Sequence, residues 1–394
     1  MNARPVYLDH QATTPVDPRV VAAMLPYLTT EFGNPSSSHG YGRAAAAAVE
    51  AARAQVASLI GAEPDEIVFT SSGTESNHLA LTGVAQSVRA RGGGRRIVTT
   101  TIDHPATQAT CDRLAADGFR ITRVGVGSDG RLGLPDCARA LEPDTCLVSV
   151  MHANNEIGTL QPLSELAALT RGRGILLHTD AAQSLASVPT DVGTLGVDLL
   201  TVVGHKMYAP KGVGALYIRR GTPSLVPQLV GGGQEHGRRA ATENVPGIVA
   251  LGAAASLALA ERDADAARIR TLRDSLLRTL TAGLPGLRVN GSTTYGLPGN
   301  LSLTLPAITA QELAEAVPEV AFSAGAACHT TSSAPSPVLT AIGLTAEQAE
   351  RTIRLGIGRF TSETDIRTAA QAILRAAGAT LAHAGWPNAV GDPS

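Results

Sequence analysis

Short apolar runs alternate with helical stretches between about residues 66 and 218, and this rhythm limits the possible folds more than any other feature. The runs are rich in β-branched residues, and they are Ile67–Thr70, Arg96–Thr99, Leu147–Val150, Ile175–His178 and Leu199–Val202. Helical patterns such as Glu75–Arg89 and Pro162–Thr170 lie between them. Because parallel strands require crossover connections of this kind, the sequence predicts an α/β fold with a mostly parallel sheet that is covered on both faces.

The rest of the chain predicts a second, smaller unit. A helical region from about Val249 to Leu280 leads out of the alternating region, and the strands Leu301–Thr304 and Thr352–Gly356 then alternate with further helices. A chain of 394 residues is long enough for two domains. We therefore expect a large domain over residues 16–260 and a smaller α+β domain formed by residues 1–15 and 261–394.

The composition argues against several classes of function. The net charge is −2 and aromatic residues make up 3% of the chain, so no basic stripe with interleaved aromatic residues is available to bind nucleic acid. The first residues contain no apolar signal core, and no apolar stretch approaches the roughly 20 residues that span a bilayer. The sequence predicts a cytoplasmic protein with neither nucleic acid nor a membrane as a direct partner.

Lysine is almost absent from the chain. Lys206 and Lys211 are the only two among 32 lysines and arginines, and both lie in the stretch Val203–Gly212. Arginine can replace the charge of lysine but cannot form a Schiff base, because its guanidinium group stays protonated. Lys206 directly follows a predicted buried strand. It is therefore the better candidate for an amine that reacts with a carbonyl group, as pyridoxal phosphate requires. The alternative is a surface lysine retained by chance.

The four cysteines form no CxxC pair and show no zinc-ligand spacing, so we expect no metal site. Cys111, Cys137 and Cys146 are predicted to be small buried apolar residues. Cys328 is different, because it lies in a small, polar, proline-punctuated run that predicts an exposed loop at about residues 323–336. An exposed thiol is a liability unless it is used, and Cys328 is therefore a candidate reactive group.

Two features at predicted strand ends could bind an anionic, aromatic ligand. Gly73 and Thr74 open a helix directly after a strand, and the free N–H groups of a helix N-terminus can bind a phosphate group. Asp180 follows the strand that begins near Ile175, at the edge of the sheet where ligands of open α/β sheets bind. A carboxylate there could keep a pyridine nitrogen protonated. Simple helix capping is the alternative for both features.

Two further strand ends carry polar residues. His104 could stack on a planar cofactor and transfer protons near neutral pH, although a histidine before a proline is more often structural. Asn155 lies in a polar segment that follows the strand ending at Val150. Taken alone, each feature is weak. Together with Lys206 and Asp180 they indicate a pyridoxal phosphate site.

At these residues the chain resembles the class V aminotransferase-like cysteine desulfurases of the nitrogen-fixation and iron–sulfur assembly type. The resemblance covers nearly all of the chain, from Tyr7–Pro15 to Ile353–Arg359. Its motifs are Phe32–Ser37, Gly73–Ser76, Asn154–Gly158 and Gly204–Lys206. It implies the fold of a fold-type I pyridoxal phosphate-dependent transferase, with a mostly parallel seven-stranded sheet in the large domain, and it implies a homodimer.

The resemblance also implies a role for each site residue. Lys206 would form the Schiff base with the cofactor and remove the substrate α-proton, with His104 stacked over the ring. Asp180 would pair with the pyridine nitrogen and Gln183 with the phenolic oxygen, while Asn155 would contact cofactor and substrate. The phosphate group would be held by Gly73, Thr74, His205 and, from the partner subunit, Thr242. The substrate carboxylate would be held by Asn34, Asn155 and Arg354.

The implied activity is conversion of L-cysteine to L-alanine. The Cys328 thiolate would attack the substrate sulfur and become a persulfide, and a sulfur-acceptor protein, for example in iron–sulfur cluster assembly, would then receive that sulfur. Two features of the chain depart from the usual pattern of this family. Val203 stands where many members have a serine that binds phosphate, and the surroundings of Cys328 are more apolar than usual.

Three alternatives follow from these residues. The stretches Gly231–Glu235 and Ala327–His329 also resemble selenocysteine lyases, so L-selenocysteine is the alternative substrate. A transaminase or another pyridoxal phosphate enzyme that ignores sulfur would not need Cys328. A non-catalytic scaffold for sulfur assembly would be expected to have lost Lys206, Asp180 or Cys328, and all three are present.

Overall fold

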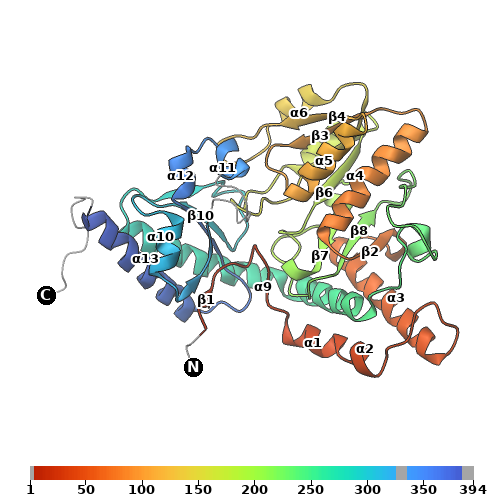
Figure 1. Ribbon diagram of the computed structural model, residues 1–394, viewed down its shortest axis with the longest axis horizontal. Coiled ribbons are helices and arrows are strands. Elements are labelled where there is room, and N and C mark those ends of the chain that lie inside the picture. Colours follow the sequence, from red (N-terminus) through yellow and green to blue (C-terminus); the bar gives the residue numbers. More distant parts are fainter. Residues whose placement is uncertain (1–3, 325–334, 384–394) are drawn as a thin grey trace.

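The computed structural model describes residues 4–324 and 335–383 (Figure 1). Its largest sheet has seven strands in the order β2-β8-β7-β6-β5-β3-β4. In chain order these strands are β2 (Ile67–Thr70), β3 (Arg96–Thr100), β4 (Arg120–Val124), β5 (Thr145–Ser149), β6 (Leu176–Asp180), β7 (Leu199–Val203) and β8 (Gly214–Ile218). β8 runs antiparallel to both of its neighbours, and the other pairs are parallel. The predicted mostly parallel seven-stranded sheet is confirmed.

Two strands of this sheet, β4 and β8, are not among the five strands that the sequence predicts. β4 is an edge strand whose sequence, Arg-Ile-Thr-Arg-Val, is only partly buried. β8 is fully buried but antiparallel, and it joins β2 to the rest of the sheet. The five runs identified in the sequence form β2, β3, β5, β6 and β7, with ends that differ by at most two residues.

Helices cover both faces of the large sheet (Figure 1). Adjacent residues of one strand enter different cores, as expected for a strand that is buried on both faces: Val68 packs with α4 and α5, whereas Phe69 packs with α3 and α9. The helices of this half are α1 (Pro18–Met24), α2 (Pro26–Thr29), α3 (Gly40–Ile60), α4 (Gly73–Ala90), α5 (Pro105–Ala116), α6 (Leu134–Ala140), α7 (Leu163–Arg171) and α8 (Val192–Leu195).

The second unit is built on a four-stranded antiparallel sheet in the order β12-β13-β10-β9. These strands are β9 (Arg288–Asn290), β10 (Asn300–Thr304), β12 (Ser323–Ala324) and β13 (Thr352–Gly356). The N-terminal strand β1 (Val6–Tyr7) pairs with β11 (Val320–Ala321) in the same unit. Its helices are α10 (Ala310–Ala316), α11 (Pro337–Ala341), α12 (Ala346–Glu350) and α13 (Glu363–His383).

The long helix α9 (Val245–Gly283) belongs to both halves (Figure 1). Its first part contributes Val245 to Ala258 to the core beneath the large sheet, and its second part contributes Ile269 to Leu280 to the core of the second unit. By length and composition alone, α9 is the one helix in the described ranges that could cross a membrane, and half of its most apolar window is buried inside the molecule. The expectation that no apolar stretch of the chain is long enough to span a bilayer is therefore wrong for α9. A core helix of a protein without a membrane span has the same length and composition.

The division into residues 16–260 and residues 1–15 with 261–394 stays a proposal. Within the second unit, the backbone N–H of His10 donates to the carbonyl oxygen of Gly356 at 3.3 Å, and Asp9 forms a bridge with Gly356. A small apolar cluster joins the loops of the large sheet to α11 and α12, and it contains Ile102, Ile157, Val338, Leu339, Ile342 and Ala349.

Candidate active site

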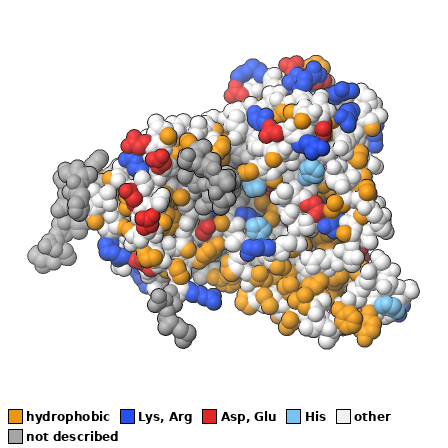
Figure 2. Space-filling view, in the orientation of Figure 1, with side chains coloured by type: hydrophobic (Ala, Val, Ile, Leu, Met, Phe, Trp, Pro, Cys, Tyr) orange, Lys and Arg blue, Asp and Glu red, His pale blue; other side chains and the backbone are white. Residues whose placement is uncertain are grey.

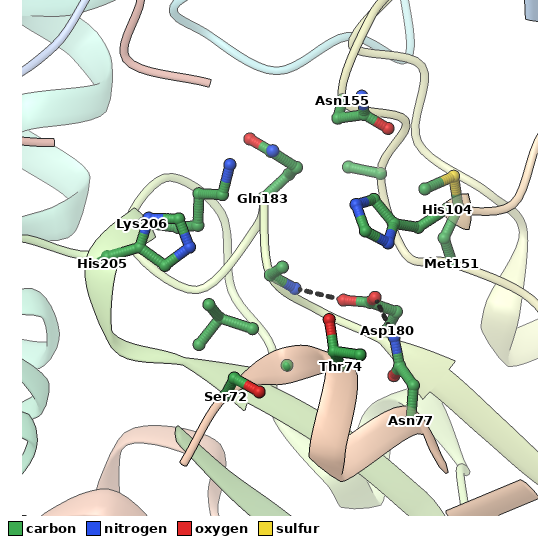
Figure 3. A pocket seen from close by; sticks show the side chains of 14 residues that line it. Ser72, Thr74, Asn77, His104, Met151, Asn155, Asp180, Gln183, His205 and Lys206 are labelled. Atoms are coloured by element: carbon green, nitrogen blue, oxygen red, sulfur yellow. Dashed lines mark hydrogen bonds between the residues drawn. The ribbon is translucent and has the colours of Figure 1, made fainter. Parts of the chain in front are cut away.

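A cavity of about 140 Å³ opens at the carboxyl ends of the parallel strands. Figure 3 shows its side chains, with Lys206 and His205 on one side and His104, Met151 and Asn155 on the other. The lining residues come from the loops after β2, β3, β5, β6 and β7, and they are Ser72, Gly73, Thr74, Asn77, His104, Met151, Ala153, Asn155, Asp180, Ala182, Gln183, Val203, His205 and Lys206. Most predicted site residues therefore meet in one place.

The start of α4 forms the floor of this cavity. Ser72 is the N-cap residue, and its side chain accepts a hydrogen bond from the backbone N–H of Glu75 at 3.2 Å. The N–H groups of Gly73 and Thr74, in the first helical turn, have no acceptor within the helix. A Cβ atom on Gly73 would lie 2.5 Å from Cγ2 of Val203, so glycine allows the helix to start close against β7. This arrangement is a suitable anion site.

Asp180 ends β6 and lines the cavity beside Thr74 and Asn77 of α4 (Figure 3). One carboxylate oxygen accepts from Nδ2 of Asn77 at 2.6 Å, and the other accepts from the backbone N–H of Ala182 at 2.9 Å. The second amide atom of Asn77, Oδ1, is buried without a partner. These two bonds fix the plane of a 7% exposed carboxylate that can face a protonated ring nitrogen.

His104 is the N-cap residue of α5, and its Nδ1 atom accepts from the backbone N–H of Ala106 at 3.1 Å. A neutral ring in this position carries its proton on Nε2. The preceding residue, Asp103, is fully buried and accepts bonds from Thr100 N at 2.9 Å, Thr99 Oγ1 at 3.0 Å and Met151 N at 2.7 Å. Asp103 therefore ties the end of β3 to the end of β5 directly behind His104.

Lys206 ends a short 3₁₀ turn, Gly204–Lys206, that follows β7. Its amine donates to the carbonyl oxygen of Ala12 at 2.7 Å and also to that of Gln11. Burial, and then the positive charge of Arg354, lower the pKa of this amine to about 8. The neighbouring His205 ring lies 3.1 Å from Thr13 Oγ1, and burial lowers its pKa to about 4. The lowered pKa increases the fraction of neutral amine near physiological pH, and the reactive role of Lys206 stays a prediction.

Arg354 reaches the rim of the cavity from β13 in the second unit. Its Nη1 atom donates to the backbone carbonyl of Asn155 at 2.9 Å, and its Nη2 atom donates to Asp9 and Ser323 at 2.8 Å each. The Nε atom is buried without a partner. The Nε–H group and the second N–H of Nη1 thus remain for further acceptors, which suits a carboxylate ligand.

Among the described residues, the predicted site residues Asn34, Thr242 and Arg354 are not part of the cavity lining. Asn34 is exposed in this chain, and its side chain accepts from the backbone N–H of Ser36 at 2.9 Å. Thr242 is exposed in the segment before α9. Cys328 lies outside the described residues. Gln183 lines the cavity, and its amide donates to the carbonyl oxygen of Gln11 at 3.0 Å.

Sequence reasoning missed part of the site. Asn77 follows Gly73 by four positions, so the two face the same side of α4, and this spacing could have identified it. The carbonyl groups of Gln11 and Ala12 gave no signal, because backbone acceptors are independent of side-chain type.

The family comparison agrees with this geometry. The model of the family described as aminotransferase class-V matches residues 6–368. The cysteine desulfurase IscS of Anaeromyxobacter dehalogenans is 48% identical over 364 residues, which cover 92% of this chain and 90% of that relative. The cysteine desulfurase of Homo sapiens is 46% identical over 365 residues, which cover 92% of this chain and 79% of that relative.

Solved structures give the same result. A structure titled NifS-like protein has a TM-score of 0.88 at 35% identity, and the match covers 94% of this chain and 98% of that one. The chain therefore belongs to the class-V aminotransferase family and, within it, to the cysteine desulfurases. This result confirms the predicted family and fold class.

Pyridoxal phosphate is the cofactor of this family, and the cavity residues fit it. The donor set contains a helix N-terminus for a phosphate group, a carboxylate bonded to Asn77 of the same helix for a ring nitrogen, and the amine of Lys206 on another side of the cavity. Gly73 keeps the backbone of α4 close to β7, and Val203 adds an apolar contact where a hydroxyl group would donate.

Proposed function

We propose that this protein removes sulfur from L-cysteine, releases L-alanine and carries the sulfur on Cys328 as a persulfide. The observation that carries the proposal is the half-buried amine of Lys206, whose pKa is lowered to about 8, in one cavity with Asp180. A lysine in this state can both react with a carbonyl group and accept a proton. The identity to cysteine desulfurases supports the choice of reaction.

The bound cofactor supplies an electron-withdrawing ring that makes the α-proton of an attached amino acid removable. Asp180, held by Asn77 and Ala182, keeps the ring nitrogen charged. Gly73, Thr74 and His205, which line the cavity, would hold the phosphate group, Gln183 would pair with the phenolic oxygen, and His104 would stack over the ring. Lys206 then accepts the α-proton at its Nζ atom.

The substrate carboxylate is assigned to Arg354 together with Asn34 and Asn155. The unpaired Nε atom of Arg354 supports this assignment, because a buried donor without a partner is costly unless a ligand completes it. A solved structure titled SspA in complex with cysteine, with a TM-score of 0.79 and 35% identity over 90% of this chain and 99% of that one, supports cysteine as the substrate.

Sulfur transfer requires a second nucleophile. The Cys328 thiolate attacks the substrate Sγ atom, so that a sulfur–sulfur bond forms while the Cβ–Sγ bond breaks. The electron pair left on the carbon takes up a proton, and alanine is released. A thiolate of the sulfur-acceptor protein then attacks the outer sulfur, so that the acceptor carries the persulfide and the Cys328 thiolate is regenerated. Iron–sulfur cluster assembly is the destination that we favour.

A homodimer completes the proposed site, with Thr242 reaching the phosphate group of the partner subunit. An exposed apolar surface around α1 and α2 supports it, and Figure 2 shows hydrophobic side chains gathered over these helices. The exposed residues include Val21, Leu25, Leu28, Phe32, Tyr41 and, in the segment that precedes Thr242, Val230. Monomeric proteins rarely expose a contiguous apolar surface of large extent.

A cytoplasmic location is the final part of the proposal. Cys111, Cys137 and Cys146 are buried and unpaired in the described structure, which suits a reducing compartment. Burial raises the pKa of each of these thiols to about 11 or 12, so none of the three is expected to compete with Cys328 as a nucleophile.

The decisive experiment compares the parent protein with Cys328→Ser and with Cys146→Ser as the matched control. We expect Cys328→Ser to lose alanine formation from L-cysteine and labelling of the persulfide, and Cys146→Ser to keep both. Undiminished alanine formation by Cys328→Ser would refute the persulfide route. Turnover on L-selenocysteine, measured in parallel, tests the selenocysteine lyase alternative, which a faster reaction than on L-cysteine would favour.

A further inference from the structure

Tyr208 has an unusual backbone conformation two residues after Lys206. Its φ angle is +67°, in the left-handed region that side chains other than glycine rarely adopt. Tyr208 is also buried, with 6% of its surface exposed. Strained residues of this kind persist only where the surroundings hold them, and they cluster at functional sites. The contacts of Tyr208 therefore indicate the functional role of its left-handed backbone conformation.

Thr14 holds the backbone on both sides of Lys206. Its Oγ1 atom accepts from the backbone N–H of Tyr208 at 2.9 Å and donates to the carbonyl oxygen of His205 at 3.1 Å. Its own backbone N–H donates to the same carbonyl at 2.9 Å. The carbonyl of Tyr208 in turn accepts from the backbone N–H of Asp17 at 3.0 Å. Lys206 thus lies in a turn that is fixed at either end.

Arg359 holds the side chain of Tyr208. The backbone N–H of Arg359 donates to the phenolic oxygen at 2.6 Å, and its guanidinium carbon lies 4.7 Å from the ring centroid. This distance is within the range of a cation–π contact. Phe360 adds an edge contact, with ring centroids 5.7 Å apart at 85°. The tyrosine ring is therefore held on two sides by residues that follow β13.

Arg359 is itself immobilised between carboxylates. Its side chain is 7% exposed and bonds to Asp17 at 3.0 Å and to Asp265 of α9 at 2.8 Å, with Glu261 at 3.6 Å. These partners come from the start of α1 and the middle of α9. Arg359 thus joins the second unit, the long helix and the turn that carries Lys206.

We propose that Tyr208 and Arg359 are positioning residues for Lys206: by holding the turn in its left-handed conformation they keep the amine directed into the cofactor cavity. Neither side chain belongs to the cavity lining, so both act through the backbone of the turn. The inference rests on the proposed role of Lys206 as the amine that binds pyridoxal phosphate. It assigns the second unit a part in cofactor attachment.

The test measures where pyridoxal phosphate becomes fixed. Each purified protein, freed of cofactor, is incubated with pyridoxal phosphate and treated with borohydride, and labelling of Lys206 relative to Lys211 is measured by peptide mapping. Lys211 serves as an internal reference, because it is the other lysine of the chain. The variants are Tyr208→Phe, which removes the hydroxyl acceptor and keeps the ring, and Arg359→Lys, which keeps the charge and removes the planar group. The control is Tyr217→Phe, at a buried tyrosine of β8 outside the site.

We expect the ratio of Lys206 to Lys211 labelling to fall about two- to tenfold in Tyr208→Phe, as for the loss of one buried hydrogen bond. A larger fall is expected in Arg359→Lys, and no change in Tyr217→Phe. An unchanged ratio in Tyr208→Phe would overturn the proposal, and so would an equal fall in the control. If Arg359→Lys does not fold, the proposal is decided by the labelling ratio of Tyr208→Phe alone. If the ratios follow the expectation but the parent forms no alanine from L-cysteine, the proposed function fails and the positioning role stands.

Discussion

The two sides of the active-site cavity are built in different ways. The side formed by the large sheet takes each functional group from a strand end, so that His104, Asp180 and Lys206 follow β3, β6 and β7. The opposite side is assembled from distant segments, in which Gln11 and Ala12 meet Lys206 and Arg354 meets Asn155. The comparison teaches that reacting groups sit on the rigid sheet, while their alignment depends on contacts between the two units.

The sharpest way to break this comparison is to remove the reacting amine. Lys206→Ala is expected to lower alanine formation by about 10²–10⁴-fold, the range associated with loss of a positioned proton acceptor. Borohydride should then fix no cofactor at residue 206. Lys211→Ala provides the matched control, because Lys211 is exposed and lies outside the cavity lining. Equal losses in the two variants would show that the reacting amine has been misassigned.

A second prediction concerns the support behind His104. Burial raises the pKa of Asp103 from 3.8 to about 6, against the opposing effect of its hydrogen bonds. Since the folded-state pKa lies above the unfolded-state value, this group's contribution to stability is present below about pH 4 and is lost as the pH rises through about 6. A shift of about two units corresponds to about 3 kcal/mol.

Denaturant titrations of the parent and Asp103→Asn between pH 4.5 and 7 check this sign. The stability of the parent relative to Asp103→Asn should decrease as the pH rises, because the asparagine cannot ionise. A difference that stays constant or grows with pH would mean that the hydrogen bonds from Thr100 and Met151 outweigh burial.

The smallest expected effect tests the contact between the two sides. Ser336 caps α11 and donates to Glu156 at 2.5 Å, whereas Thr345 caps α12 and accepts from Gln348 N at 3.2 Å. Thr345→Ala should cost about 1 kcal/mol for the cap alone. Ser336→Ala should cost about 2–3 kcal/mol, because a hydrogen bond to a charged group is also lost. Equal midpoints of urea unfolding for the two variants would show that the hydrogen bond from Ser336 to Glu156 adds no stability beyond that of the helix cap.

Much of the large sheet could be predicted because its central strands are buried on both faces. Thr145–Ser149 and Leu199–Val203 are buried along their whole length, and strands that are buried on both faces need no alternation of apolar and polar residues. The edge strand β4 contains Arg120 and Arg123 and resembles a surface loop in composition. The antiparallel course of β8 places it between β7, which precedes it directly in the chain, and β2, which is distant in sequence.

The same division applies to the site. Asp180, His104 and Lys206 could be predicted because each follows a recognisable strand, and the structure brings them together in one cavity. Tyr208 and Arg359 could not, because their roles depend on a backbone angle and on contacts across 151 positions of sequence. The role of Cys328, which lies outside the described residues, stays a prediction.

The shared helix α9 has a consequence for how the molecule comes apart. The two parts of α9 pack in separate hydrophobic cores. Unfolding of either core would therefore remove packing contacts from the other. Heat or urea should therefore disrupt both halves in a single transition. The turn that carries Lys206 keeps its position relative to Arg354 of β13 and to Arg359 for as long as the protein remains folded.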